Sequence, residues 1–195
     1  GSGILAKNMA NNGYTITGVD LSQDMITLAK RKVPNVHFVT SSFYSIDIPP
    51  CKVVTATGEC FNYIFEDSYA MSIIKDLFGR IYNSLTTRGL FIFDFAMPGR
   101  VLSSKKNNWK QNNWEMEVEH HEDEHSKALT RKIKLKVHTQ NGVKEGQEIH
   151  QLQLFEKDEL KSILIEVGFI PKFVNGFGSF IFPFEYGYGG FVAEK

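Results

Sequence analysis

The first residues of the chain combine two glycines with a later acid in a spacing that can bind a nucleoside. Gly1 and Gly3 precede an amphipathic stretch, and the apolar run YTITGV (14–19) ends at Asp20. Glycines in a strand-to-helix turn let the backbone approach a ligand closely, and the helix start offers unpaired N–H donors. The acid is placed to accept hydrogen bonds from ribose hydroxyls. This pattern predicts an adenosine site at the carboxyl edge of an α/β sheet, with an ordinary glycine turn as the structural alternative.

Two classes of nucleotide fit this turn. Residues 1–6, GSGILA, also satisfy the G-x-G-x-x-A fingerprint of dinucleotide-binding proteins. A short-chain dehydrogenase would in addition need a Tyr-x-x-x-Lys catalytic pair, and the sequence contains none. An NAD(P)-dependent oxidoreductase is therefore the runner-up interpretation rather than the favoured one.

A second group of candidate residues lies on a predicted antiparallel hairpin. Residues 114–119 alternate apolar side chains with glutamates, and residues 132–137 alternate lysines with apolar side chains. Pairing position 117 with 134 sets each glutamate opposite a lysine and each apolar residue opposite an apolar one. Both faces agree on one register, as a real pairing requires.

Two histidines and an arginine interrupt the apolar face of this hairpin. The face continues to His120 on the first strand and to Arg131 on the second. The turn signal QNGV (140–143) predicts a third strand at 145–155, with His150 on the same face and opposite Ile133. We expect the face to roof an acceptor pocket, with His120 or His150 as the general base. A structural histidine at the rim of a packed sheet is the alternative.

The rest of the chain alternates predicted helices and strands. Hydrophobic periodicity and capping residues predict helices at 3–12, 22–32, 67–85 and 157–167, and strands at 14–19, 36–40, 52–57, 90–95, 169–174 and 188–194. This alternation predicts a mainly parallel sheet covered on both faces. The expected organisation is an α/β core at 1–108, an antiparallel elaboration at 109–155 and a return to the core at 156–195.

Composition excludes some partners. The 22 basic and 22 acidic side chains cancel, so no global field favours nucleic acid or an anionic membrane. No apolar run approaches the ~20 residues that span a bilayer. Cys51 and Cys60 follow no metal-binding spacing, so we expect no metal site and a reducing, cytoplasmic compartment. The chain is expected to be a monomer or a homodimer.

The chain resembles the class I S-adenosylmethionine-dependent methyltransferases. The segments that carry the resemblance are GSGILA (1–6), GVDLSQDMITLA (18–29), TATGECFNYI (55–64), TTRGLFIFDF (86–95), FEKDELKSILIEVGF (155–169) and GGFVAEK (189–195). They are similar to the glycine-rich turn, the second motif, the segment after the fourth strand, the fifth strand, the last helix and the reversed final strand. The resemblance is strongest to bacterial small-molecule methyltransferases, including aminosugar N-methyltransferases, and it implies a Rossmann-like fold with a reversed last strand.

The resemblance implies S-adenosylmethionine as the cofactor. Asp20 would hold the ribose, Met25 would line the adenine side, and the segment from Thr57 would lie beside the methionine part. Where the family often has an acid after its third strand, this chain has two serines and a phenylalanine. The implied cofactor contacts are Gly1, Ser2, Gly3, Asp20, Leu21, Met25, Ser41, Ser42, Phe43, Thr57, Gly58 and Glu59. Asn62, Tyr63 and Arg131 would face a small-molecule acceptor.

The family's first strand, with its D-x-G ending, does not precede the glycine turn. That strand is central in the family's sheet, so we expect it to be missing from the chain and the natural protein to begin ~35–45 residues earlier. A non-catalytic nucleotide-binding protein of the same fold is a third interpretation. The favoured function is methyl transfer to nitrogen or oxygen of a small molecule.

Overall fold

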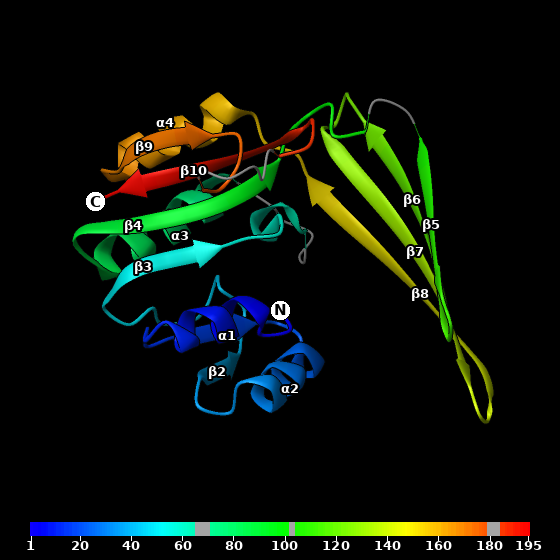
Figure 1. Ribbon diagram of the computed structural model, residues 1–195. Helices are drawn as coiled ribbons and strands as arrows, with labels where there is room; N and C mark the ends of the chain where they lie inside the picture. Colours follow the sequence, from blue (N-terminus) through cyan, green and yellow to red (C-terminus); the bar gives the residue numbers. More distant parts are fainter. Residues whose placement is uncertain (65–70, 102–103, 179–183) are drawn as a thin grey trace. The chain divides into compact units, whose positions relative to one another are not determined.

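The computed structural model describes residues 1–64, 71–101, 104–178 and 184–195 (Figure 1). Its contacts divide the chain into two compact units, Gly1–Pro49 and Pro50–Lys195. None of the described helices has the length and apolar character needed to cross a membrane.

The first unit is a small α/β layer. Its elements are α1 (Ile4–Asn11), β1 (Thr17–Asp20), α2 (Gln23–Lys32) and β2 (His37–Thr40). The two strands are parallel, with Asp20 opposite Thr40 at the carboxyl end. Ser22 caps α2 by accepting a hydrogen bond from the Met25 N–H, as its position before an amphipathic run predicts. The core is limited to five buried residues, Ile26, Ala29, Val33, Val36 and Phe38.

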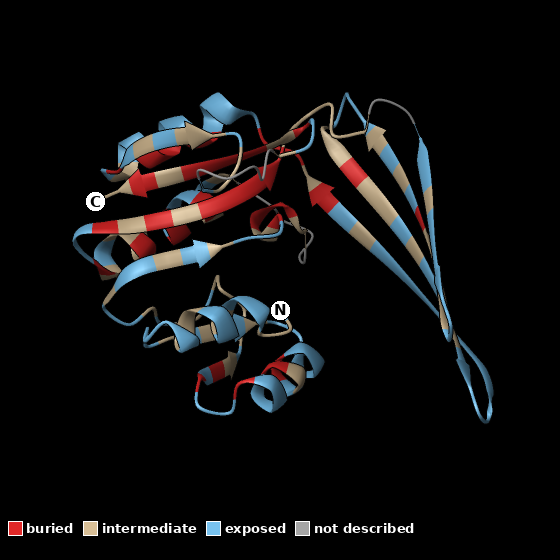
Figure 2. Cartoon of the chain, viewed as in Figure 1, coloured by how far each residue is buried: buried red, intermediate tan, exposed pale blue. Residues whose placement is uncertain are grey.

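The second unit is built on a four-stranded sheet. Its strands β3 (Cys51–Ala56), β4 (Leu85–Ala96), β9 (Ile170–Val174) and β10 (Tyr188–Glu194) lie in the order β3-β4-β10-β9. β3 and β4 are parallel, whereas β10 runs antiparallel to both of its neighbours. The predicted α/β class with a reversed last strand is therefore confirmed. Figure 2 shows β4 and β10 buried along most of their length.

Aromatic side chains fill the core beside this sheet. The helices α3 (Met71–Ser84) and α4 (Lys157–Val167) each bury one apolar face. Phe78 of α3, Phe61 and Phe169 from the connecting segments, and the rings of β4 and β10 meet at 4.6–6.0 Å in edge-on, tilted and stacked pairs. The fully buried rings are Phe78, Phe91, Phe93, Phe95, Phe155 and Phe191. The chain's many phenylalanines thus form the core that the apolar strand at 90–95 predicts.

Strand β4 is longer than the sequence predicts. It begins at Leu85 instead of residue 90, directly after α3 ends at Ser84. Its pairing with β3 shifts register between Cys51 and Val53, and Arg88 lies at φ 61°. This irregular stretch hides the strand from a periodicity argument, because a bulge breaks the alternation of side chains. Residues 67–70 of the predicted helix lie outside the described residues.

A second sheet in this unit is wholly antiparallel. Its strands are β5 (Lys105–Gln111), β6 (Trp114–Asp123), β7 (Ala128–Thr139) and β8 (Gly142–Gln153), paired in sequence order. The β6–β7 register is the predicted one, with Glu117 opposite Lys134 and Val118 opposite Ile133. Strand β5 was not predicted from the sequence, because Trp109 is its only apolar residue.

The predicted register of β8 is wrong by two residues. His150 lies opposite Arg131, and Ile133 lies opposite Glu148. The cause is the turn, whose two central residues are Gln140 and Asn141 rather than Asn141 and the following glycine. A shift of two preserves the alternation of faces, so His150 still shares the face of His120.

Candidate active site

The glycine turn and the acid of the first unit meet. Asp20 accepts a hydrogen bond from the amino group of Gly1 through Oδ2 and one of 2.8 Å from the Ser22 N–H through Oδ1. Gly3 is left-handed (φ 79°) and begins α1, where no side chain caps the free N–H groups. A Cβ on Gly3 would lie 3.0 Å from Ala29. Both the positive φ and the close contact with Ala29 therefore favour glycine at this position.

The other cofactor candidates of this unit surround the end of β1. Leu21 and Met25 are 52% and 44% exposed, so two apolar side chains stand open beside Asp20. The Ser41 N–H donates to the Asp20 carbonyl at 3.1 Å, which brings the loop after β2 to the same edge. Ser42 Oγ accepts from the Tyr44 N–H at 3.2 Å and so serves the loop itself. The Phe43 and Tyr44 rings lie 4.5 Å apart.

In the second unit, a sharp turn follows β3. Gly58 and Glu59 both have positive φ, 93° and 58°. Asp94, buried near the end of β4, accepts the Gly58 N–H at 2.8 Å and the Glu59 N–H at 2.7 Å. Burial raises the pKa of the Asp94 carboxyl, and the two N–H donors oppose that rise. The turn is thus pinned to the core sheet, while Thr57 accepts only the Cys60 thiol at its carbonyl.

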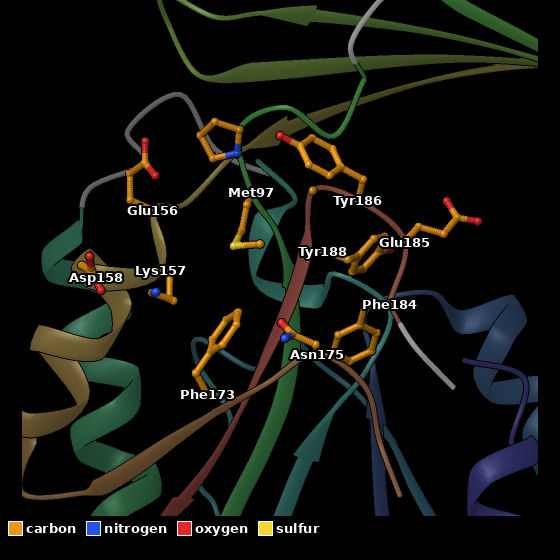
Figure 3. Close-up of a pocket in the computed structure, with 12 residues that line it drawn as sticks. Met97, Glu156, Lys157, Asp158, Phe173, Asn175, Phe184, Glu185, Tyr186 and Tyr188 are labelled. Atoms are coloured by element: carbon orange, nitrogen blue, oxygen red, sulfur yellow. The ribbon is translucent and has the colours of Figure 1, made fainter. Parts of the chain in front are cut away.

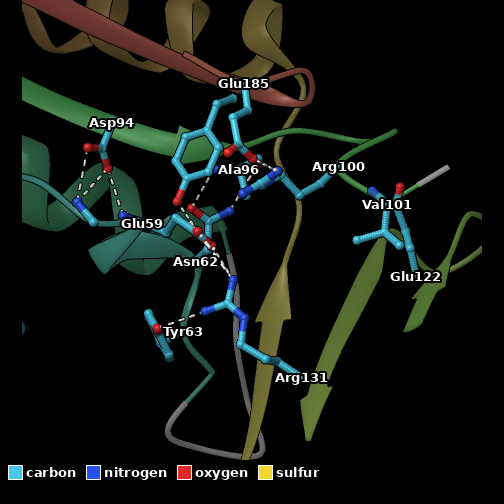
Figure 4. Close-up of polar contacts among 12 residues, drawn as sticks. Glu59, Asn62, Tyr63, Asp94, Ala96, Arg100, Val101, Glu122, Arg131 and Glu185 are labelled. Atoms are coloured by element: carbon cyan, nitrogen blue, oxygen red, sulfur yellow. Dashed lines mark hydrogen bonds and ion pairs between the residues drawn. The ribbon is translucent and has the colours of Figure 1, made fainter. Parts of the chain in front are cut away.

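The pinned turn places a carboxylate among groups from other strands (Figure 4). Glu59 is buried, and the Arg131 Nη2 on β7 donates to its two oxygens at 3.2 and 3.3 Å. The Tyr188 hydroxyl at the start of β10 donates to the same carboxylate. Arg131 Nη1 donates to the Tyr63 hydroxyl at 3.3 Å. Burial is the largest influence on Glu59 and raises its pKa, against the charges of Arg131 and Arg100.

Asn62 joins the two sheets of this unit. Its Nδ2 donates to the Ala96 carbonyl at 2.9 Å and to the Gln153 carbonyl at 2.6 Å, and its Oδ1 accepts the Ala96 N–H at 2.9 Å. The side chain is fully buried. The Asn62 amide thus forms its hydrogen bonds with backbone groups of β4 and β8. These bonds indicate a structural role for Asn62, whereas the sequence suggested that it contacts the acceptor.

The predicted histidines lie on either side of Arg131. His120 pairs with Arg131, which pairs with His150. The pKa of His120 is lowered, first by burial and then by the positive charges of Arg131, Arg100 and Lys105. His150 Nε2 lies 3.1 Å from a Glu148 oxygen, and its ring meets the Tyr63 ring edge-on at 5.4 Å.

Two residues of this cluster were not predicted. Asp94 is the single acid in an apolar strand, which is a signal the sequence does contain. Arg100 stacks over the Tyr188 ring at 4.4 Å and donates to Glu185 at 3.0 Å. Neither contact can be inferred from spacing, because the partners lie more than 80 residues apart in the chain.

A pocket of about 540 Å³ adjoins the cluster (Figure 3). Its lining residues are Met97, Pro98, Glu156, Lys157, Asp158, Phe173, Asn175, Phe184, Glu185, Tyr186, Gly187 and Tyr188. The tail at 180–188 has an aromatic residue at every second position. Phe180 and Phe182 lie outside the described residues, and the other three line this pocket. Tyr188 contributes its ring to the pocket and its hydroxyl to Glu59.

Known proteins resemble this chain in sequence and in fold. Residues 1–89 match the sequence profile of a family described as a methyltransferase domain. The chain also superposes over its whole length on 80% of an S-adenosylmethionine-dependent methyltransferase from Clostridium acetobutylicum, with a TM-score of 0.82 and 19% identity. The chain therefore matches a methyltransferase family over residues 1–89 and has the fold of an S-adenosylmethionine-dependent methyltransferase over its whole length. The predicted resemblance is confirmed.

Other class I methyltransferases share the fold at low identity. An amino pentose methyltransferase from Micromonospora echinaspora, solved with S-adenosylmethionine, matches 100% of this chain and 79% of its own, with a TM-score of 0.77 and 16% identity. A sugar N-methyltransferase from Streptoalloteichus matches 100% and 76%, with a TM-score of 0.80 and 15% identity. A Geobacillus protein, named provisionally as a methyltransferase, is 33% identical over 100 residues. That alignment spans 48% of this chain and 38% of the relative.

Proposed function

We propose that this protein transfers a methyl group from S-adenosylmethionine to a nitrogen or oxygen atom of a small molecule. The observation that carries the proposal is the left-handed glycine turn at the start of α1 together with Asp20 at the carboxyl end of β1, in a stretch that matches a methyltransferase family. An amino pentose methyltransferase and a sugar N-methyltransferase among the proteins of similar fold support a small, polar acceptor.

The first unit has the groups that an adenosine moiety needs. No side chain caps the start of α1, so its first backbone N–H groups can donate to a ligand. A side chain at Gly3 would collide with Ala29 and change this turn. Asp20 offers carboxylate oxygens to ribose hydroxyls, and Leu21 and Met25 offer exposed apolar surface to a purine. Gly1, Ser2, Gly3, Ser41, Ser42 and Phe43 complete this part of the proposed site, and Thr57, Gly58 and Glu59 belong to the proposed methionine side.

S-adenosylmethionine supplies an activated methyl group on a sulfonium, so the protein mainly has to align the acceptor and exclude water. The acceptor's lone pair forms the new bond to the methyl carbon while the carbon–sulfur bond breaks, and sulfur leaves as a neutral thioether. An acceptor that arrives protonated must also lose a proton. We assign that proton to His120 or His150, with Tyr63 and Arg131 beside the acceptor.

Ligand-induced stabilisation tests the proposal. S-adenosylhomocysteine at 100 times its dissociation constant should stabilise the intact protein by ~2.7 kcal/mol, which raises the melting temperature. NADH at the same concentration should leave it unchanged. A shift with NADH alone would favour the oxidoreductase, and a shift with S-adenosylhomocysteine but no transfer to any amine or hydroxyl acceptor would favour the non-catalytic interpretation.

A further inference from the structure

Four side chains lie in one row across the antiparallel sheet. Lys105 on β5 pairs with His120, His120 pairs with Arg131, and Arg131 pairs with His150. Directly paired positions have their side chains on the same face of a sheet. A permanent positive charge therefore lies between the two histidines.

The guanidinium in this row is held from outside the sheet. Arg131 uses Nη2 for the two Glu59 oxygens and Nη1 for the Tyr63 hydroxyl, and its side chain is 15% exposed. Tyr188 bonds the same carboxylate from β10. Groups from two further segments thus fix where the positive charge of Arg131 lies, which surface arginines do not experience.

Two nitrogens of the row remain unused. Arg131 Nε and His150 Nδ1 are buried and have no hydrogen-bond partner among the residues that the structure describes. Buried polar atoms normally find partners, so an unpaired set next to an arranged ion pair indicates a place where another molecule completes the bonding.

Glu59 also carries two energetic costs at one position. Its backbone is left-handed, which disfavours a residue with a Cβ, and its carboxylate is buried. The connection between the sheets does not require these costs, because Asn62 already bonds the backbones of β4 and β8. Strain and buried charge that packing does not require are typical of functional sites.

We propose that Arg131 is a positioning residue for methyl transfer, and that Glu59 holds Arg131 in the place from which its positive charge acts on the paired His120. The inference rests on the proposed function and deepens it. Arg131 acts through His120, and Glu59 acts on His120 only through Arg131.

The charged groups around His120 agree with this role. Lys105 faces it from β5, Arg131 from β7 and Arg100 from the segment after β4. The nearest acid along its own strand and face is Glu122, whose oxygens accept the Gly99 and Val101 N–H groups. Burial first, and then the surrounding positive charge, disfavours the imidazolium, so the lone pair of His120 is available to accept a proton near neutral pH.

The first experiment removes the charge of Arg131 and follows both the histidine and the reaction. In Arg131→Met, the NMR titration of His120 should move to higher pH, and the acid limb of the kcat/KM profile should move with it. Arg131→Lys keeps the charge and should stay closer to the wild-type titration. The matched control is Lys134→Met on the opposite face of the same strand, which should change neither profile.

A double variant separates positioning from stability. Arg131→Met alone leaves Glu59 buried without its counter-ion, whereas Glu59→Gln/Arg131→Met removes both charges and should regain melting temperature. Its acid limb should nevertheless stay at the raised pH. Return of the limb to the wild-type position along with stability would overturn the proposal, as would an unmoved His120 titration in Arg131→Met. The NMR titration of His120 can be measured without turnover. A wild-type protein without methyltransferase activity would therefore refute the proposed function, while the titration would still show whether Arg131 acts on His120.

Discussion

The two units of the chain hold their polar groups in different ways. In Gly1–Pro49, Asp20 is 24% exposed, and its described partners are the amino group of Gly1 and a backbone N–H. In Pro50–Lys195, Glu59, Asn62 and Asp94 are each less than 10% exposed and are bonded to strands far along the chain. The first arrangement keeps a carboxylate partly exposed to solvent, whereas the second uses buried polar side chains to fix other parts of the protein. A candidate cofactor side and a candidate acceptor side thus differ in how much of the site is already assembled.

The largest effect should come from the histidines of the assembled side. Replacing the true base by alanine, whether His120 or His150, should lower turnover by ~10²–10⁴ at neutral pH, with unchanged affinity for S-adenosylhomocysteine. Raising the pH should partly restore turnover, because more acceptor then arrives deprotonated. The control is His121→Ala, one residue along β6 and on the other face. Full turnover in both alanine variants would make the histidines structural.

The pH dependence carries a definite sign. The pKa of His120 is lowered from the ordinary value of 6.5, by burial and by neighbouring cations. If His120 is the base, the acid limb of kcat/KM should therefore lie below pH 6.5. His120 binds its proton more readily in the unfolded chain than in the folded one. The free energy of unfolding should therefore fall as the pH drops from the pKa of His120 in the unfolded chain through its lower pKa in the folded protein. Thermal melts of wild type and His120→Ala between pH 4 and 8 measure this difference.

Asn62 should show how much of the second unit depends on polar bonds inside it. Asn62→Ala leaves buried backbone groups of Ala96 and Gln153 without partners, which should cost roughly 2–5 kcal/mol in the free energy of unfolding. Asn83→Ala on the exposed face of α3 is the control and should stay within about 0.5 kcal/mol. Equal denaturation midpoints for the two variants would contradict a structural role for Asn62.

In the first unit, Asp20→Ala should weaken S-adenosylhomocysteine binding by about 10–100-fold, since bonds to a charged acceptor contribute more than neutral ones. The melting temperature without ligand should change little, because Asp20 serves no buried strand contact. Asp24→Ala, in the exposed first turn of α2, should bind like wild type. Calorimetric titration that finds equal affinity for both variants would remove Asp20 from the ribose site.

The smallest effect should follow from reversing a partly exposed charge whose two lysine partners are exposed. Glu117 pairs with Lys106 at 2.8 Å and with Lys134 at 3.5 Å on the outer face of the antiparallel sheet. Glu117→Lys should still leave the melting temperature within about 2 °C of wild type, because exposed ion pairs contribute little. A large loss would mean that this face, too, depends on its charges.

The sequence predicts pairing well where two kinds of complementarity coincide. On β6 and β7, charge and apolar matching independently favour one register, and the structure has it. On β8, the prediction depended on one turn, and glycine at 142 occupies the first strand position instead of the turn centre. The register predicted from the turn alone was wrong by two residues, whereas the register predicted from both charge and apolar matching was correct.

The candidate site divides along the same line. The glycine turn and Asp20 are close in sequence and carry a local pattern, so their meeting is predictable. Glu59, Arg131 and Tyr188 meet across 72 and 129 residues of chain, and their approach depends on how three strands end. Periodicity places Arg131 on the right face of its strand but does not show which carboxylate lies across from it.

The hydrogen bonds from the turn after β3 to Asp94 have a consequence for backbone amide exchange. The N–H groups of Gly58 and Glu59 belong to no helix or strand, and loop amides usually lose their protons to solvent quickly. Here both donate to one buried carboxylate. Their deuterium uptake should therefore be slow, on the timescale of core strands. Two slowly exchanging amides in a loop would report, without any substrate, whether this part of the molecule is closed before a ligand arrives.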